Sequence, residues 1–184
     1  MGMPAQDTYW TLEMVRALPE DGNRYEVLDG VLLVSPAPSL RHQRAIQLLY
    51  DHVAPYVRQH RLGETLWSPA DIELSPTRML QPDLFVIPAD LKVTSWKDVT
   101  RLLLTAEVLS PSTARWDRKD KRIAYQEKEI PEYWIVDIDA HLFERWRPAD
   151  RRPELLSEEI EWQPLTSVPP LRIDLIQYFA DVWR

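Results

Sequence analysis

The chain has 184 residues, of which 45% are hydrophobic and 28% charged, the ordinary balance of a globular protein. It contains no cysteine, which excludes disulfides, thiolate zinc sites and cysteine nucleophiles. The net charge of −7 argues against a general nucleic-acid coat, because backbone binding depends on Lys and Arg near phosphates, and confines such binding to a local patch. Clustered acids, by contrast, suit a hard divalent cation.

The length favours a single domain over residues 1–184. No apolar run approaches the roughly 20 residues needed to span a bilayer, so we expect no membrane association. The N-terminus has neither a basic flank nor an apolar stretch, so we expect no signal peptide. Together with the absence of cysteine, these features favour a cytoplasmic protein.

The chain is expected to begin with a short helix and a hairpin. Thr11 can cap a helix over residues 11–18. Residues 24–28 and 31–35 have strand patterns, and the Asp29-Gly30 dipeptide between them is a strong signal for a two-residue hairpin turn.

A longer helix is expected next. Ser39 can cap it, Pro55 should kink or interrupt it, and Gly63 is a natural stop. Its apolar residues recur at helical spacing: Ile46, Leu49, Val53 and Val57.

The middle of the chain favours strands at residues 64–67, 71–74 and 83–87. Residues 102–109 form a nearly continuous apolar run, which is typical of a strand buried on both faces. Thr113 can then cap a helix that runs to about residue 128.

The last third is expected to hold strands at residues 133–138 and 141–146, an edge strand within 154–162, and a final helix over 174–183 capped by Asp174. This order of elements predicts an α/β fold with a central mixed β-sheet flanked by helices, preceded by the N-terminal helix and β-hairpin.

Two acids stand out for chemistry. Asp83 follows Gln81-Pro82 at the opening of an apolar strand, and Glu107 is the only charge within residues 102–109. A carboxylate in so apolar a strand is costly unless a metal ion or a cationic partner compensates it. Two acids on neighbouring strands are able to hold Mg²⁺ together with its waters.

The helix after Glu107 supplies further polar groups. Asp117, Lys121 and Tyr125 are spaced i, i+4, i+8 and so share one face. Lys121 lies at the border of the packed side, better placed than Lys119 to reach inward. A different face gathers basic residues: Arg115, Arg118, Lys119 and Arg122.

In order and spacing, these features resemble the PD-(D/E)XK superfamily of restriction-endonuclease-like proteins, and within it the Uma-type family of small endonucleases. The resemblance runs from about Thr11 to the C-terminus. Its pieces are the segments 25–30 (YEVLDG), 36–42, Pro82-Asp83, 107–113 (EVLSPST), the triplet Asp117, Lys121 and Tyr125, and 132–137 (EYWIVD).

One position departs from the superfamily pattern, which places a lysine two residues after the glutamate on the same strand. That position is Leu109 here. The resemblance implies that the lysine has moved to the following helix, where Lys121 matches it.

The resemblance implies hydrolysis of phosphodiester bonds in a nucleic acid, DNA rather than RNA. Asp83 and Glu107 would bind Mg²⁺ or Mn²⁺, and Lys121 would position the attacking water or stabilise the phosphoryl oxygens. Glu26 would add a third carboxylate, directly or through water. A homodimer is compatible with this activity, because cutting both strands of a duplex commonly needs two sites.

Each candidate also has a purely structural interpretation. Asp83 could be a strand-entry acid after a proline turn, and Glu107 could be an ion-pair partner of Lys121 with no metal. Lys121 could form an i, i+4 salt bridge with Asp117, and Glu26 could be a cross-strand charge on the hairpin.

Other residues favour the structural interpretation. A capping or solvated His42, a packed Tyr125, a solvent-exposed basic face and tryptophans buried in the core are the commoner arrangements. For the whole chain, the alternative is a non-catalytic binding or assembly module that retains the nuclease fold.

Overall fold

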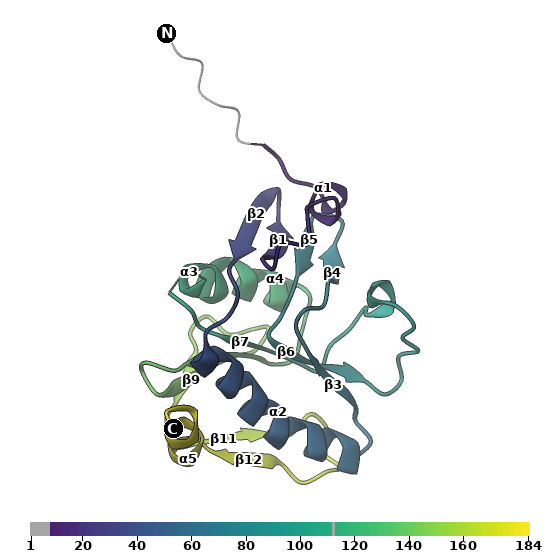
Figure 1. Cartoon of the computed structure of the whole chain (residues 1–184). Coiled ribbons are helices and arrows are strands. Elements are labelled where there is room, and N and C mark those ends of the chain that lie inside the picture. The colour runs from purple at the N-terminus through teal and green to yellow at the C-terminus, as the bar shows by residue number, and fades with distance from the viewer. Residues whose placement is uncertain (1–7, 112) are drawn as a thin grey trace.

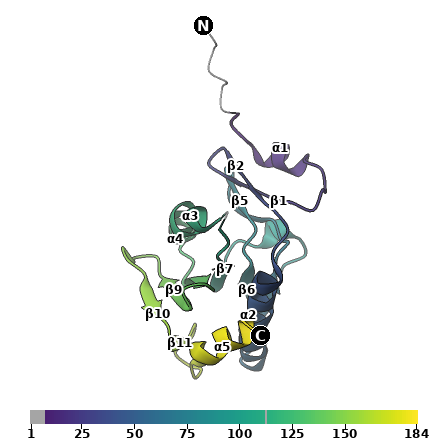
Figure 2. The same cartoon turned by 60° about the vertical axis from the view of Figure 1, so that its left-hand side comes forward.

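The computed structural model describes residues 8–111 and 113–184 and has a mixed α/β architecture, in which a small sheet and a larger mixed sheet are joined by helices (Figures 1 and 2). This confirms the fold class expected from the sequence. The elements in chain order are α1 (Leu12–Arg16), β1 (Arg24–Leu28), β2 (Val31–Ser35), α2 (Leu40–Gln59), β3 (Gly63–Trp67), β4 (Ile72–Ser75), β5 (Arg78–Leu80), β6 (Leu84–Pro88), the 3-10 helix η1 (Trp96–Asp98), β7 (Leu104–Val108), α3 (Ala114–Trp116), the π-helix η2 (Asp117–Lys121), α4 (Arg122–Glu127), β8 (Tyr133–Asp137), β9 (Leu142–Trp146), β10 (Glu154–Leu156), β11 (Glu159–Trp162), β12 (Leu171–Asp174) and α5 (Leu175–Val182).

The small sheet has four strands in the order β2-β1-β5-β4 and lies at the top of Figure 1. Its hairpin β1–β2 turns at Asp29 and Gly30, whose φ angles of 50° and 86° are both positive. A two-residue turn of this kind requires such angles at both positions. The hairpin expected from the sequence is therefore present at the expected residues.

The larger sheet has six strands in the order β10-β9-β8-β7-β6-β3. Its neighbours are antiparallel except β7 and β8, which run parallel with Glu107 opposite Ile135. Parallel neighbours need a crossover connection. Here α3, η2 and α4 provide it, and Figure 1 shows this helix between the two sheets.

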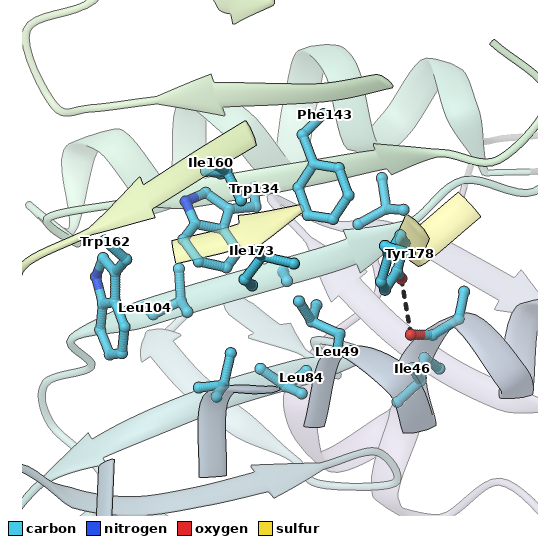
Figure 3. Close-up of a cluster of buried hydrophobic side chains, with 14 of the residues drawn as sticks. Ile46, Leu49, Leu84, Leu104, Trp134, Phe143, Ile160, Trp162, Ile173 and Tyr178 are labelled. Carbon is cyan, nitrogen blue, oxygen red and sulfur yellow. Dashed lines mark hydrogen bonds between the residues drawn. The ribbon is translucent and has the colours of Figure 1, made fainter. Parts of the chain in front are cut away.

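One face of the six-stranded sheet is covered by α2, α5 and the two-stranded sheet β11–β12. Large aromatic side chains fill this layer, and Figure 3 shows Trp134, Phe143 and Trp162 gathered there. Tyr178 of α5 donates a hydrogen bond from its hydroxyl to the carbonyl oxygen of Ala45 in α2, 2.8 Å away. This layer is the main apolar core of the protein and fixes α2 against the sheet.

Several element boundaries differ from those expected. Helix α2 continues through Pro55 to Gln59 without interruption, and Gly63 begins β3 instead of ending the helix. Strands β5 and β12, of three and four residues, were not expected from the sequence. Residues 154–162 hold two strands, β10 and β11, which belong to different sheets. Among the described residues, no helix is both long enough and apolar enough to cross a bilayer.

Candidate active site

Strand alternation places Asp83 and Glu107 on the same face of the six-stranded sheet. Leu84 pairs with Ala106 in the antiparallel ladder of β6 and β7, so Asp83 lies beside Glu107 at the end of this ladder. The backbone N–H of Val108 donates to Asp83 Oδ2 at 2.8 Å. Leu84 and Val108, which follow Asp83 and Glu107 in the chain, belong to the apolar layer under α2. The two acids therefore point to the opposite face, where each is only 1% exposed.

Lys121 occupies the centre of a buried group of carboxylates. Its Nζ lies 3.0 Å from Glu26 Oε2, 3.2 Å from Glu107 Oε1 and 3.4 Å from Asp117 Oδ1. The Lys121 side chain is 1% exposed. We call Glu26, Asp83, Glu107, Asp117 and Lys121 the acidic cluster.

The crossover helix positions the lysine. Asp117 and Lys121 are the first and last residues of the π-helix η2, a rare form that occurs frequently at functional sites. One turn later, the Tyr125 hydroxyl donates to Glu107 Oε1 at 2.9 Å. The Tyr133 hydroxyl donates to the carbonyl oxygen of Asp117 at 3.1 Å. These bonds from buried tyrosines hold both the helix and the glutamate in place.

Asp83 has a second set of partners. Arg24 Nη1 donates to its Oδ1 at 2.6 Å, and His42 Nε2 lies 3.1 Å from its Oδ2. Glu26 in turn accepts the backbone N–H of Gln81 on Oε1 at 2.7 Å. The small sheet and the start of α2 thus both contribute to the surroundings of Asp83.

The acids of the cluster differ in their ionisation. Burial opposes ionisation of Asp83, but its hydrogen bond to His42 and the charges of His42 and Arg24 outweigh burial and lower its pKa to about 2. Burial raises the pKa of Glu107 well above its usual range, although Lys121 acts in the other direction. Burial also raises the pKa of Asp117. For Lys121, burial lowers the pKa, but the carboxylates around it, led by Glu107, raise it well above the usual value.

A cleft of about 800 Å³ opens beside the cluster. It lies where the hairpin leads into α2 and where the parallel strands β7 and β8 end. Arg24 and His42, the partners of Asp83, both line it. The full lining comprises residues 35–39, 41–42, 109–111 and 137–140 with Arg24, Ala114 and Arg118.

The donor set fits a hard divalent cation in chemistry and charge. Four buried carboxyl groups face two permanent cations, Arg24 and Lys121, so full ionisation of the carboxyls leaves the group short of positive charge. Mg²⁺ binds through one or two carboxylates and keeps several waters, and Asp83 and Glu107 supply such a pair. Within residues 8–111 and 113–184, no group of three or more Asp, Glu, His or Cys side chains has the arrangement to hold a metal. A cation here would therefore use two acids and water.

Comparisons with known proteins identify a family and a shared fold. The family model of Uma2, described as a putative restriction endonuclease, matches residues 12–175. The chain belongs to the Uma2 family. No curated protein matches the chain.

Among solved structures, this Uma2-family chain resembles the crystal structure of a putative nuclease of DUF820 from Anabaena variabilis ATCC 29413. The TM-score is 0.77 at 15% sequence identity, over 94% of this chain and 99% of that one. At so low an identity the likeness shows a shared fold alone, which agrees with the mixed α/β fold expected from the sequence.

All four residues proposed from the sequence, Glu26, Asp83, Glu107 and Lys121, lie in the acidic cluster. Lys121 does reach the acids although Leu109 occupies the usual lysine position. Its salt bridge with Asp117 is also present, so the structural and the functional interpretation of Lys121 coexist in one geometry.

Sequence reasoning did not select Arg24 and expected a capping or solvated His42, whereas the structure places both against Asp83. Arg24 precedes Glu26 by two residues in β1, so strand alternation could have placed both on one face. His42 had no comparable signal, because its approach to Asp83 depends on how α2 meets the sheet. In the basic face expected on the crossover helix, Arg118 is paired with Asp137 and Glu144.

Proposed function

We propose that this protein is a metal-dependent nuclease, acting as one domain, that hydrolyses phosphodiester bonds, of DNA rather than RNA. The observation that carries the proposal is the convergence of Asp83, Glu107 and Lys121 in one buried group. Arg24 and His42, which contact Asp83, line the neighbouring cleft. Membership of the Uma2 family supports nuclease chemistry in general. Family membership does not specify a metal ion or a preference for DNA, and both are part of this proposal.

Asp83 and Glu107 are the residues proposed to bind Mg²⁺ or Mn²⁺. When bound, such a cation lowers the pKa of a coordinated water and offsets charge on the phosphate. Glu107 is suited to the role because Tyr125 and Lys121 both bond to its Oε1, which fixes the carboxylate before any ligand arrives.

Lys121 is proposed to stabilise charge on the phosphoryl oxygens or to orient the attacking water. Glu26 and Asp117 keep its ammonium beside Glu107, and burial of the whole side chain excludes competing solvent. Electrostatic stabilisation is strongest in such a preorganised site of low dielectric. Glu26 is thus a positioning residue for the lysine.

A second candidate function, a non-catalytic binding module, has one observation in its favour. Both carboxylate oxygens of Asp83 are already engaged, Oδ1 by Arg24 and Oδ2 by His42 and the Val108 N–H. Such a closed arrangement is also what a purely structural ion-pair network would show.

Nicking of supercoiled plasmid with Mg²⁺, with Mn²⁺ and with EDTA separates the two functions. We expect the wild type to nick only with metal, and Lys121→Gln to lose on the order of 10²–10³ in rate, as when one electrostatic contact to the transition state is removed. Lys119→Gln is the matched control, because Lys119 lies two residues away on the exposed side of the same helix.

Near-ultraviolet circular dichroism of both variants checks that folding is retained. A wild type that cleaves neither DNA nor RNA with either metal would favour the binding module. Equal rates for Lys121→Gln and the wild type would reject the role assigned to the lysine.

A further inference from the structure

The first turn of α2 carries positive charge where a helix ordinarily prefers negative charge. The helix dipole places partial positive charge at its N-terminus, so acids there are stabilising and cations are not. The first turn of α2 has no acid and holds Arg41 and His42. In a helix of 20 residues this arrangement lowers stability, and a bound anion would reverse the effect.

His42 is an independent sign of a ligand at this end of the helix. Its side chain is 7% exposed and lines the cleft. Nε2 is used on Asp83, but Nδ1 is buried without a hydrogen-bond partner in the described part of the chain. A buried imidazole nitrogen left in this way is costly. In the imidazolium form, with Nε2–H on Asp83, the Nδ1–H would donate to an oxygen of a ligand in the cleft.

Arg41 is available to the same ligand. Its guanidinium lies 3.7 Å from the ring centre of Trp183 and forms no ion pair with a carboxylate of residues 8–111 or 113–184. Ser39 caps the helix by accepting the N–H of His42 at 3.2 Å, which accounts for one of the N–H groups that a first turn leaves free.

The walls of the cleft differ in charge. Arg24, Arg41 and His42 lie on the side of the hairpin and α2, whereas the end of β8 and the loop after it present Asp137 and Asp139. Arg118 offsets Asp137 through its ion pair. An anion entering the cleft is therefore drawn toward the start of α2 and away from the loop.

We propose that the start of α2 is a phosphate subsite, in which the first-turn N–H groups, Arg41 and His42 Nδ1 bind a backbone phosphate of a nucleic-acid strand lying in the cleft. The identity of the ligand as a nucleic acid rests on the proposed function. The subsite itself requires only phosphate chemistry. Because His42 also contacts Asp83, the subsite lies next to the acidic cluster, and the bound phosphate is a neighbour of the one that is cleaved.

Binding measured without metal tests the subsite independently of cleavage. Fluorescence anisotropy of a labelled oligonucleotide in EDTA compares the wild type with Arg41→Gln. Arg58→Gln is the matched control, because it removes the same charge from the exposed last turn of the same helix. We expect Arg41→Gln to bind roughly tenfold more weakly, as for the loss of one charge-assisted hydrogen bond. The slope of the logarithm of the binding constant against the logarithm of the salt concentration should be smaller by about 1 in Arg41→Gln than in the wild type. The slope for Arg58→Gln should equal that of the wild type.

Two further arms identify the source of the phosphate. Inorganic phosphate and a 5′-mononucleotide, each against chloride of equal ionic strength, should raise the melting temperature of the wild type and of Arg58→Gln more than that of Arg41→Gln. If only these small anions bind and the oligonucleotide does not, the subsite serves a free phosphate and the strand assignment is wrong. Identical affinity and salt slope for Arg41→Gln and the wild type would overturn the subsite.

These outcomes are distinguishable from failure of the proposed function. Oligonucleotide binding that depends on Arg41, with no metal-dependent cleavage, retains the subsite and rejects the nuclease. Cleavage whose KM and kcat are unchanged in Arg41→Gln retains the nuclease and rejects the subsite.

Discussion

The two faces of the six-stranded sheet are built from alternate residues of the same strands, and the acidic cluster lies on one of them, beside apolar side chains such as Phe85 and Ile135. In β6 and β7, Leu84 and Val108 enter the apolar layer under α2, while the adjacent Asp83 and Glu107 enter the acidic cluster. All four of these side chains are almost completely excluded from solvent. The apolar side chains of both faces gain stability from burial, whereas the acidic cluster must balance its desolvation cost by pairing.

The difference shows where a buried charge is tolerated. The cluster lies over a sheet already fixed from its other side by large aromatic residues (Figure 3). A sheet that is held rigidly on one face can carry, on its other face, groups whose burial costs stability. Functional groups are often of this kind.

Removing the central cation should have the largest effect on stability. Lys121→Met leaves three buried carboxylates without their shared partner, and we expect a loss of about 3–5 kcal/mol in the free energy of unfolding. Leu49→Ala in the apolar layer is the control, with a similar expected loss of about 2–5 kcal/mol. Urea denaturation at several pH values separates the two. The deficit of Lys121→Met should shrink as the pH falls and the carboxylates become protonated. A pH-independent deficit like that of Leu49→Ala would mean that the lysine matters only for packing.

Neutralising Asp83 should have a smaller effect. The pKa of Asp83 is lowered from 3.8 to about 2, so its contribution to stability is present above pH 3.8 and is lost as the pH falls through about 2. Asp83→Asn should therefore lower the free energy of unfolding at pH 7 by about 2 kcal/mol, and the difference from the wild type should narrow below pH 3.8. Chemical denaturation across this range measures it. A variant as stable as the wild type at pH 7 would show that Arg24 and His42 do not stabilise the aspartate.

Neutralising Glu107 should have the smallest effect and the opposite sign. The pKa of Glu107 is raised above 4.5, so its favourable contribution is complete below pH 4.5 and is lost as the pH rises through the folded-state value. Glu107→Gln keeps an oxygen for Lys121 and Tyr125, and we expect it to be more stable than the wild type at pH 7 by roughly 1 kcal/mol. The gain should fade toward pH 4.5. Calorimetry should show Mn²⁺ binding weakened in this variant. A loss of stability at pH 7 would mean that Lys121 needs the full charge of this glutamate.

The sequence predicted the elements whose signals are local. The Asp29-Gly30 turn, the Ser39 and Asp174 caps and the apolar run before Glu107 were all confirmed at their expected positions. Strands β5 and β12 were missed because each is short and is defined by the strand with which it pairs. The continuation of α2 through Pro55 was missed because the tertiary packing of its apolar side outweighs the local effect of proline.

The residues of the candidate site also divide into those with a local sequence signal and those without one. Asp83, Glu107 and Lys121 could be selected from the sequence because each is a charge in an apolar or periodic setting. The contribution of His42 could not, since its contact with Asp83 joins a helix start to a strand start that are unrelated in local pattern. The pairing of Arg24 with Asp83 likewise depends on how the small sheet meets the large one.

The parallel pairing of β7 and β8 has a consequence for the order of events during folding. The crossover that joins these strands is the helix that carries Asp117 and Lys121, while Glu26 and Asp83 arrive from the hairpin and from β6. The acidic cluster thus exists only after contacts of long sequence separation have closed, and such contacts form slowly. Until then Glu26 and Asp83 remain hydrated, and only the sequence-local group of Glu107, Asp117 and Lys121 is able to pair.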